Sequence, residues 1–259
     1  LGLDLDLKPG RQIFRFTPTQ SGVIPWSCWM GMLRGQFDVV EPGAASTPAD
    51  ASPPGPCLRC REKKSETVSK TYTVKKGDRV LVLGASGGVG TGCVELCKLL
   101  GAHVIACASS EEKMAKLREI GADETINYTE VDFSKWAVEK YGKPQRRSYE
   151  GGVDVVINFT GGDTWHPSLR CLKRGGKLLV CGATAGYDPK EDLRYVWSFE
   201  LQIIGSNSFY DENLKALMDM IQQGTMKPVI DEVLPLERAA EGLRLIENRE
   251  VFGKVIIKP

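Results

Sequence analysis

The sequence predicts an α/β protein whose main part is a doubly wound parallel sheet with helices on both faces, preceded by a short β segment. Strand-type and helix-type patterns alternate from about Thr67 to the end of the 259-residue chain, which is typical of a parallel sheet. The apolar run Val80–Leu83 leads through a glycine-rich turn into an apolar-periodic helix, and a second run, Val104–Ala108, follows. These runs form a strand–helix–strand unit of about thirty residues.

The chain is expected to fall into three parts. Residues 1–41 mix aromatic and β-branched residues with polar ones and indicate a β-rich segment. Residues 42–66 are rich in proline, alanine, serine and glycine and then in charge, a composition that is typical of a flexible linker because it cannot bury a core. Residues 67–259 form the α/β domain.

Local signals set the expected boundaries of the later elements. Ser109 and Glu112 form a predicted capping box that opens a helix ending at Ile120, before Gly121. A helix at 165–173 is expected to stop at Gly175 and Gly176. The other expected elements are strands at 125–128, 153–159, 177–181, 201–205, 229–234 and 252–257, and helices at 132–141, 211–223 and 236–248.

The composition excludes several classes of protein. With 42% hydrophobic and 26% charged residues the chain has an ordinary globular composition. A formal net charge of +1 provides no basic stripe of the kind that nucleic-acid binding needs, and no apolar run reaches the length of a membrane span. We therefore expect a small-molecule substrate, with neither nucleic acid nor a membrane as partner.

Cysteine and histidine usage favours a reducing compartment and gives no metal site in the α/β part. Only two histidines, His103 and His166, are present, which removes most histidine-based metal sites and catalytic triads. Neither is assigned a role. Buried free thiols in the cytoplasm are the expected state of the cysteines in predicted helices and strands, which are Cys93, Cys97, Cys107, Cys171 and Cys181.

The glycine-rich turn carries the strongest functional signal. Ala85, Gly87 and Gly90 fall on the three glycine positions of the dinucleotide-binding fingerprint. A strand that enters a helix through such a turn aims backbone N–H groups at one point, and the helix N-terminus adds a partial positive charge there, which suits a pyrophosphate. The alternative is a turn that only connects two elements. The predicted cofactor contacts are Ala85, Ser86, Gly87, Gly88, Val89 and Gly90.

The end of the second strand favours NADP over NAD as the cofactor. An NAD-binding fold usually places Asp or Glu here, on the ribose 2′-hydroxyl, but this chain has Ala108. Ser109 and Ser110 can donate hydrogen bonds to a 2′-phosphate, and the Lys113 ammonium can pair with it. Alternatively, Ser109 only caps the helix and Lys113 is a solvated surface lysine.

Several segments together are similar to one enzyme family. Residues 77–90, 109–113, 121–128, 175–184 and 252–259 resemble the cofactor domain of medium-chain dehydrogenases/reductases, nearest to the quinone oxidoreductases and zinc-type alcohol dehydrogenases. The resemblance implies a Rossmann sheet of about six parallel strands. It also implies hydride transfer between a nicotinamide and a carbonyl, alcohol, quinone or enone.

The same resemblance assigns further positions. It makes Lys113 and Tyr128 contacts of the 2′-phosphate, and it implies that family members often pair through a sheet edge, so a homodimer through 201–206 is expected. The resemblance also places cofactor contacts after successive strands, where ligands collect in such sheets. These positions are Thr160, Gly161 and Gly162, then Gly182, Ala183 and Thr184, which line the nicotinamide, and then Ser206 and Asn207. The alternative for each of them is an ordinary strand-to-helix turn.

The first seventy residues depart from the family pattern. In that family an N-terminal, largely β domain holds the substrate and, in zinc members, the catalytic metal. No counterpart of that domain is recognised here, and no His–Glu pair occurs. The catalytic residues are therefore unassigned, and zinc is not supported by the sequence.

Residues 24–32 resemble the ligand loop of cupredoxin-like copper domains. Cys28, Met30 and Met32 are soft ligands suited to copper, but the segment lacks the two imidazoles of a blue-copper site. Alternatively, these side chains pack with nearby tryptophans. The spacing of Cys57 and Cys60 matches half a zinc knuckle, a disulfide or two free thiols.

These observations lead to one main hypothesis and two alternatives. The main hypothesis is a cytoplasmic NADP-dependent oxidoreductase of the zinc-type alcohol dehydrogenase and quinone oxidoreductase group. The first alternative is a non-catalytic nucleotide-binding module, or a truncated or fused fragment. The second is a copper-binding protein that acts through Cys28, Met30 and Met32.

Overall fold

The computed structural model of the protein describes residues 22–27, 34–39, 74–207, 209 and 211–259. The chain divides into two compact units, Leu1–Ser69 and Lys70–Pro259. In the first unit, β1 (Gly22–Ser27) pairs antiparallel with β2 (Arg34–Val39). β1 includes the first residues of the segment 24–32, which was predicted to be a loop, because these residues pair with β2.

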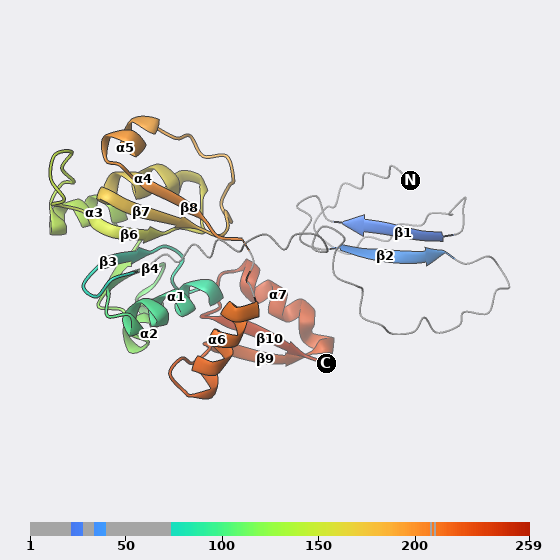
Figure 1. Ribbon diagram of the computed structural model, residues 1–259. Helices are drawn as coiled ribbons and strands as arrows, with labels where there is room; N and C mark the ends of the chain where they lie inside the picture. Colours follow the sequence, from blue (N-terminus) through green and yellow to red (C-terminus); the bar gives the residue numbers. More distant parts are fainter. Residues whose placement is uncertain (1–21, 28–33, 40–73, 208, 210) are drawn as a thin grey trace. The chain divides into compact units, whose positions relative to one another are not determined.

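The second unit contains a six-stranded parallel sheet in the order β5-β4-β3-β6-β7-β8 (Figure 1). This confirms the predicted doubly wound α/β fold. The chain order reverses between β3 and β6, which is where ligands bind in open sheets of this kind. The strands are β3 (Arg79–Val82), β4 (His103–Ala108), β5 (Glu124–Asn127), β6 (Val153–Ile157), β7 (Leu172–Val180) and β8 (Gln202–Gly205).

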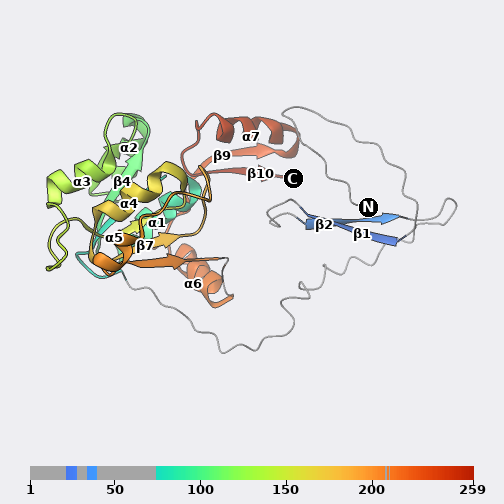
Figure 2. The same cartoon turned by 90° about the horizontal axis from the view of Figure 1, so that it is seen from above.

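Helices cover both faces of this sheet (Figures 1 and 2). One face carries α1 (Gly88–Leu99) and α2 (Glu111–Glu119), and the other carries α3 (Phe133–Tyr141), α4 (Trp165–Cys171) and α5 (Leu193–Ser198). Alternate residues of β3 supply the two cores. Val80 packs with Val94 on the α1 side, and Leu81 packs with Phe133 and Leu169 on the α3 side. Burial on both faces explains the continuous apolar runs of the central strands.

Three expected boundaries were wrong. The N-cap of α2 is Ser110, whose Oγ accepts from the Lys113 N–H at 3.3 Å, rather than Ser109. α4 ends at Cys171 because buried Leu172 already pairs with Val153 in the sheet. β7 therefore includes the two glycines expected to stop that helix. The short helix α5 was not expected.

The C-terminal strands do not extend the main sheet, which corrects the expectation of one continuing alternation. β9 (Ile230–Pro235) and β10 (Lys254–Lys258) form a separate two-stranded parallel sheet. Phe252 and Val229 pack against the α1-side core, which holds this pair beside the glycine-rich turn. The expected helix at 236–248 is a 3-10 turn, Leu236–Arg238, followed by α7 (Ala239–Glu247), whereas α6 (Asp211–Gln222) lies close to its predicted position. No helix in the described ranges combines the length and apolarity needed to cross a bilayer.

Candidate functional site

The glycine-rich turn joins β3 to α1 at very close range. The Ala85 N–H donates to the Cys107 carbonyl at 3.1 Å, which fixes the turn to the neighbouring strand. A Cβ atom on Gly90 would lie 2.4 Å from the Gly84 oxygen and 2.6 Å from the Ala85 Cα. Only glycine fits at this position, because the first turn of α1 packs directly on the backbone that precedes it.

The start of α1 leaves backbone donors free for a ligand. The N-cap residue Gly87 has no side chain to accept from the helix, and the first turn contains no acidic residue. The Thr91 N–H donates to the Gly87 carbonyl, and the parallel bridge between Gly87 and Gly253 engages the Gly88 amide, so the amides of Val89 and Gly90 are the orphan donors of this helix end. Such donors, together with the helix dipole, favour an anion.

Lys254 places a second positive charge at the same turn. A Cβ atom on Gly88 would lie 2.6 Å from the Lys254 Cγ and 2.8 Å from its Nζ, so the lysine side chain lies across this glycine. The Gly253 N–H donates to the Ser86 carbonyl at 2.8 Å and holds the lysine in place. Sequence reasoning missed Lys254, because no local pattern indicates that the last strand returns to this turn.

The residues expected at a 2′-phosphate lie on the adjoining edge of the sheet. Buried Ala108 ends β4, and the Tyr128 N–H donates to its carbonyl at 3.1 Å, so the serines after β4 and Tyr128 after β5 follow paired strands. The Lys113 ammonium donates to the Arg249 carbonyl, and partial burial lowers the Lys113 pKa. The group is brought together, with Lys113 held by the segment before β10.

The two glutamates that begin α2 engage cations along their own helix. The Glu111 and Glu112 carboxylates pair with Arg118 and Lys116, each at 2.8 Å. The hydrogen bond and charge of Lys116 lower the Glu112 pKa. Both carboxylates are therefore engaged by cations of α2 itself.

Buried Asn158 organises the loop after β6. Its Oδ1 accepts from the N–H groups of Thr160 and Gly161, both at 2.9 Å. Its Nδ2 donates to Thr164 Oγ1 at 3.1 Å and to Ser168 Oγ at 3.0 Å. Sequence reasoning also missed this residue, although an amide near the end of a largely apolar run was a visible signal.

The loops after β6 and β7 are joined by backbone hydrogen bonds. The Thr184 N–H donates to the Phe159 carbonyl at 3.2 Å, and the Ala185 N–H donates to the Thr160 carbonyl at 2.7 Å. The Thr160 Oγ1 would lie 3.6 Å from a Cβ atom on Gly84, so this loop lies beside the glycine-rich turn. The structure therefore brings Thr160 and the run Gly182–Thr184 to one edge. The Ser206 N–H, donating to the Val180 carbonyl at 2.7 Å, continues that edge.

These residues fit an extended dinucleotide. Orphan amides and Lys254 suit a pyrophosphate at the switch point of the sheet, hydroxyls and Lys113 lie toward β5, and the joined loops lie toward β7. A cavity of about 380 Å³ continues from the joined loops and is lined by Gly162, His166 and Gly186, among others.

The described cysteines provide neither a reactive thiolate nor a metal site as an alternative to the nucleotide site. Cys93, Cys97, Cys107, Cys171 and Cys181 are free thiols. Burial raises the pKa of Cys93 to about 12 and that of Cys97 to about 11, so neither is a reactive thiolate at neutral pH. The described part of the chain holds no cluster of three His, Cys, Asp or Glu suited to a metal. Cys28, Met30, Met32, Cys57 and Cys60 lie outside the described residues.

The two histidines occupy structural positions. The His103 Nε2 lies 2.7 Å from the Glu124 Oε1 at the start of neighbouring strands. The His166 ring packs edge-on against Tyr195, with the ring centres 5.5 Å apart.

Comparison with known proteins identifies the family of the chain. The family described as "Zinc-binding dehydrogenase" matches residues 88–223. Acryloyl-coenzyme A reductase of Sulfurisphaera tokodaii is 34% identical over 190 residues, which cover 72% of this chain and 52% of that protein. Human quinone oxidoreductase is 30% identical over 193 residues, which cover 71% of this chain and 55% of that protein.

Solved structures show the same relationship. An NAD-dependent alcohol dehydrogenase is 38% identical with a TM-score of 0.65, over 72% of this chain and 52% of that one. A 2-octenoyl-CoA carboxylase reductase in complex with NADP and 2-octenoyl-CoA is 32% identical with a TM-score of 0.64, over 71% of this chain and 44% of that one. The chain thus spans about half the length of the relatives it matches. It belongs to the zinc-binding dehydrogenases within the medium-chain dehydrogenase/reductase family, and it matches them through a cofactor-binding segment.

Proposed function

We propose that this chain is the cofactor-binding part of an NADP-dependent oxidoreductase. The observation that carries the proposal is the anion cradle at the start of α1, where the amides of Val89 and Gly90 and the Lys254 ammonium converge. The nicotinamide, when bound, supplies or accepts the hydride, and the chain's residues bind and orient it. The substrate is proposed to be a carbonyl, alcohol, quinone or enone.

The cradle holds the pyrophosphate by backbone and charge. Gly90 keeps α1 close to the strand, so that the amides of the first helical turn point at the phosphates. Lys254 reaches over Gly88 and neutralises one negative charge. Hydrogen bonds to charged groups contribute roughly 1.5–3 kcal/mol each, so this site supplies most of the affinity that NADP and NAD share.

The edge beside β5 selects the 2′-phosphate. Ser109, Ser110 and Tyr128 present polar groups there, and buried Ala108 provides no carboxylate to repel it. Lys113 exchanges the Arg249 carbonyl for the phosphate, a stronger acceptor because it is charged. This preference is the basis for NADP over NAD.

The joined loops orient the nicotinamide. Thr160 and the run Gly182–Thr184 lie on the same edge, and Asn158 fixes the first of these loops through its two backbone contacts. Asn158 is a positioning residue, because its side chain is turned into the protein. No described residue is assigned as the proton donor, and the relatives carry further sequence that this chain does not match.

The relatives' names narrow the substrate class. Acryloyl-coenzyme A reductase and 2-haloacrylate reductase are both named for activated double bonds. An enone-type acceptor is therefore the first substrate class to test.

Calorimetry with NADPH and NADH tests the proposal. We expect measurable heat with NADPH and weaker binding of NADH. Correctly folded protein that releases no heat with either coenzyme would contradict it. Oxidation of NADPH with enones, quinones and aldehydes then separates an oxidoreductase from a module that binds the nucleotide without turnover, which the half-length match also allows.

A further inference from the structure

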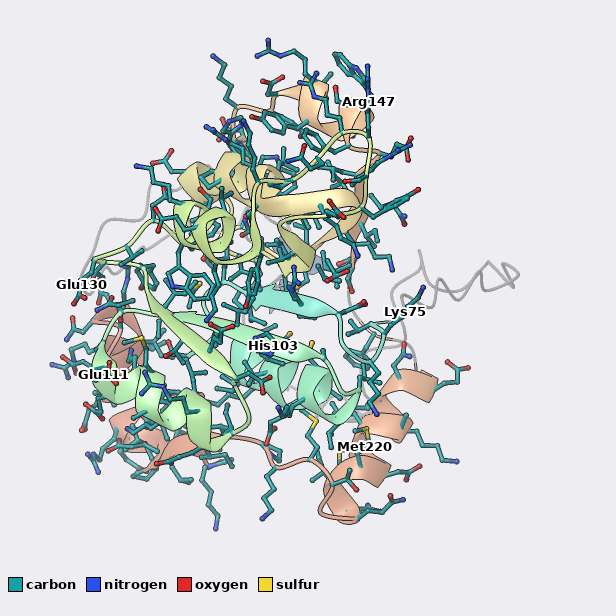
Figure 3. All side chains as sticks on the ribbon, turned by 90° about the vertical axis from the view of Figure 1, so that its left-hand side faces the viewer. Lys75, His103, Glu111, Glu130, Arg147 and Met220 are labelled. Atoms are coloured by element: carbon teal, nitrogen blue, oxygen red, sulfur yellow. The ribbon has the colours of Figure 1, made fainter. Side chains whose placement is uncertain are left out.

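A basic groove lies on the face of the sheet opposite the cofactor cradle. It is a cavity of about 900 Å³ between α3, the loop 142–152, the end of α4, and α5. A second hollow of about 380 Å³ adjoins it, because both are lined by Arg146, Arg170, Tyr195 and Phe199. In Figure 3 Arg147, which also lines the groove, lies beside the helix α5.

The groove concentrates positive charge. Six cationic side chains line the two hollows against three carboxylates, although the whole chain has a formal net charge of only +1. The cations are Lys135, Lys143, Arg146, Arg147, Arg170 and Arg194, and the carboxylates are Asp132, Glu139 and Asp192.

Two of these carboxylates are already committed to the protein. Asp132 Oδ1 caps α3 by accepting from the Ser134 N–H at 2.8 Å. Asp192 caps α5 and pairs with Arg194 at 2.8 Å, which lowers the Asp192 pKa to about 2.

Five of the six cations form no ion pair. Within the described part of the chain these are Lys135, Lys143, Arg146, Arg147 and Arg170, whereas eight other lysines and arginines, Arg194 among them, do form one. Like charges that converge on a hollow repel one another, and a bound anion removes that cost.

An aromatic surface accompanies the charge. The Arg146 guanidinium lies 5.8 Å from the centre of the buried Phe199 ring. Tyr195 is stacked on Phe199, with the ring centres 5.8 Å apart and an interplanar angle of 10°. Tyr195 is only partly buried, and because Phe199 stacks on it and His166 packs edge-on against it, its exposed part offers a ring edge to a planar group in the groove.

We propose that this groove is a second ligand site, which binds a nucleoside diphosphate. Arginine suits phosphates because its planar donors bind two oxygens at once, and Arg146, Arg147 and Arg170 are placed to do so. The exposed edge of the Tyr195 ring contacts the base in an edge-to-face arrangement. The cavity has the size of small-molecule sites, and it lies on the α3–α5 face, away from the cradle at α1, while His166 lines both the second hollow and the cavity beside the joined loops.

Titration of the whole chain with ADP and with inorganic pyrophosphate, both at saturating NADPH, tests this site. Both probes are expected to bind while NADPH stays bound, with ADP the tighter because of Tyr195. The triple variant Arg146→Gln, Arg147→Gln, Arg170→Gln should weaken both by about tenfold or more. A matched control, Lys75→Gln, Lys215→Gln, Lys258→Gln, removes three exposed cations elsewhere and should leave both affinities unchanged.

Three outcomes would overturn the proposal. These are the absence of binding by both probes, their displacement by NADPH, or unchanged affinity in the triple variant. Equal affinity for ADP and pyrophosphate would remove the base contact with Tyr195. If the protein bound no NADPH, titration of the triple variant with ADP alone would still decide whether the groove is a site. The cofactor proposal and the groove proposal can therefore be rejected independently of each other.

Discussion

The central sheet and the C-terminal unit of residues 230–258 differ sharply in how deeply their apolar residues are buried. Leu81, Ile105 and Leu178 of the sheet are completely buried. In the C-terminal unit, Val233 is 57% exposed and Leu243 is 68% exposed, and Ile246 of the same helix is similarly open. The central strands are therefore fully covered, whereas the C-terminal unit, apart from Phe252, leaves much of its apolar surface uncovered, in a chain that spans about half the length of its relatives.

The largest expected effect is on the sheet side of this comparison. Leu81→Ala should lower the free energy of unfolding by about 2–5 kcal/mol, because it opens a cavity in a fully packed core. Leu243→Ala, the same change on the exposed helix face, should cost less than about 0.5 kcal/mol. Urea denaturation of both variants measures the difference. Equal losses would mean that the two regions are packed alike.

Gly87→Val separates the function of the turn from its stability. Gly87 has φ −83° and ψ 170°, which any residue adopts, and a Cβ atom there would meet only the Gly84 oxygen at 3.5 Å. The variant should fold, yet its branched side chain would occupy the phosphate position and weaken NADPH and NADH alike by about a hundredfold. Calorimetry alongside thermal unfolding checks both statements. Retained affinity in a folded variant would count against the turn as the site.

Lys254→Gln tests whether the C-terminal unit contributes to the cradle. Loss of the ammonium should weaken both coenzymes by about tenfold, with little change in stability, because the side chain is exposed. Lys258→Gln, in the same strand, is the matched control and should have no effect. If the two variants behave alike, the lysine over Gly88 plays no part in binding.

The smallest effect is expected from Lys113→Ala, and it is selective. The substitution should weaken NADPH by several-fold to about tenfold and leave NADH nearly unchanged, because only NADPH carries the 2′-phosphate. Parallel titrations with the two coenzymes measure the ratio. Equal losses would contradict the assignment of this contact.

The predictable parts of the molecule are those in which neighbours in sequence are neighbours in space. The unit β3–α1–β4 was predicted because its buried strands, its glycines and its apolar helix face are all local signals. The separation of β9 and β10 from the main sheet was not, because it depends on Phe252 and Val229 packing against α1. The position of Lys254 and the hydrogen-bond partners of Asn158 were not predicted either, because they too depend on the tertiary fold. Ser110 replaced Ser109 as the cap although only Ser109 has a glutamate three residues later, because the backbone at the end of β4 decides which serine begins the helix.

The short segment between α7 and β10 touches two parts of the proposed dinucleotide site, the 2′-phosphate edge and the pyrophosphate turn. Its Arg249 carbonyl holds Lys113, and its Gly253 N–H holds Ser86. A protein truncated before Arg249 would keep every strand of the main sheet but would lose the hydrogen bonds that hold Lys113 and Ser86. The segment before β10 thus contributes to the proposed nucleotide site together with the glycine-rich turn before α1.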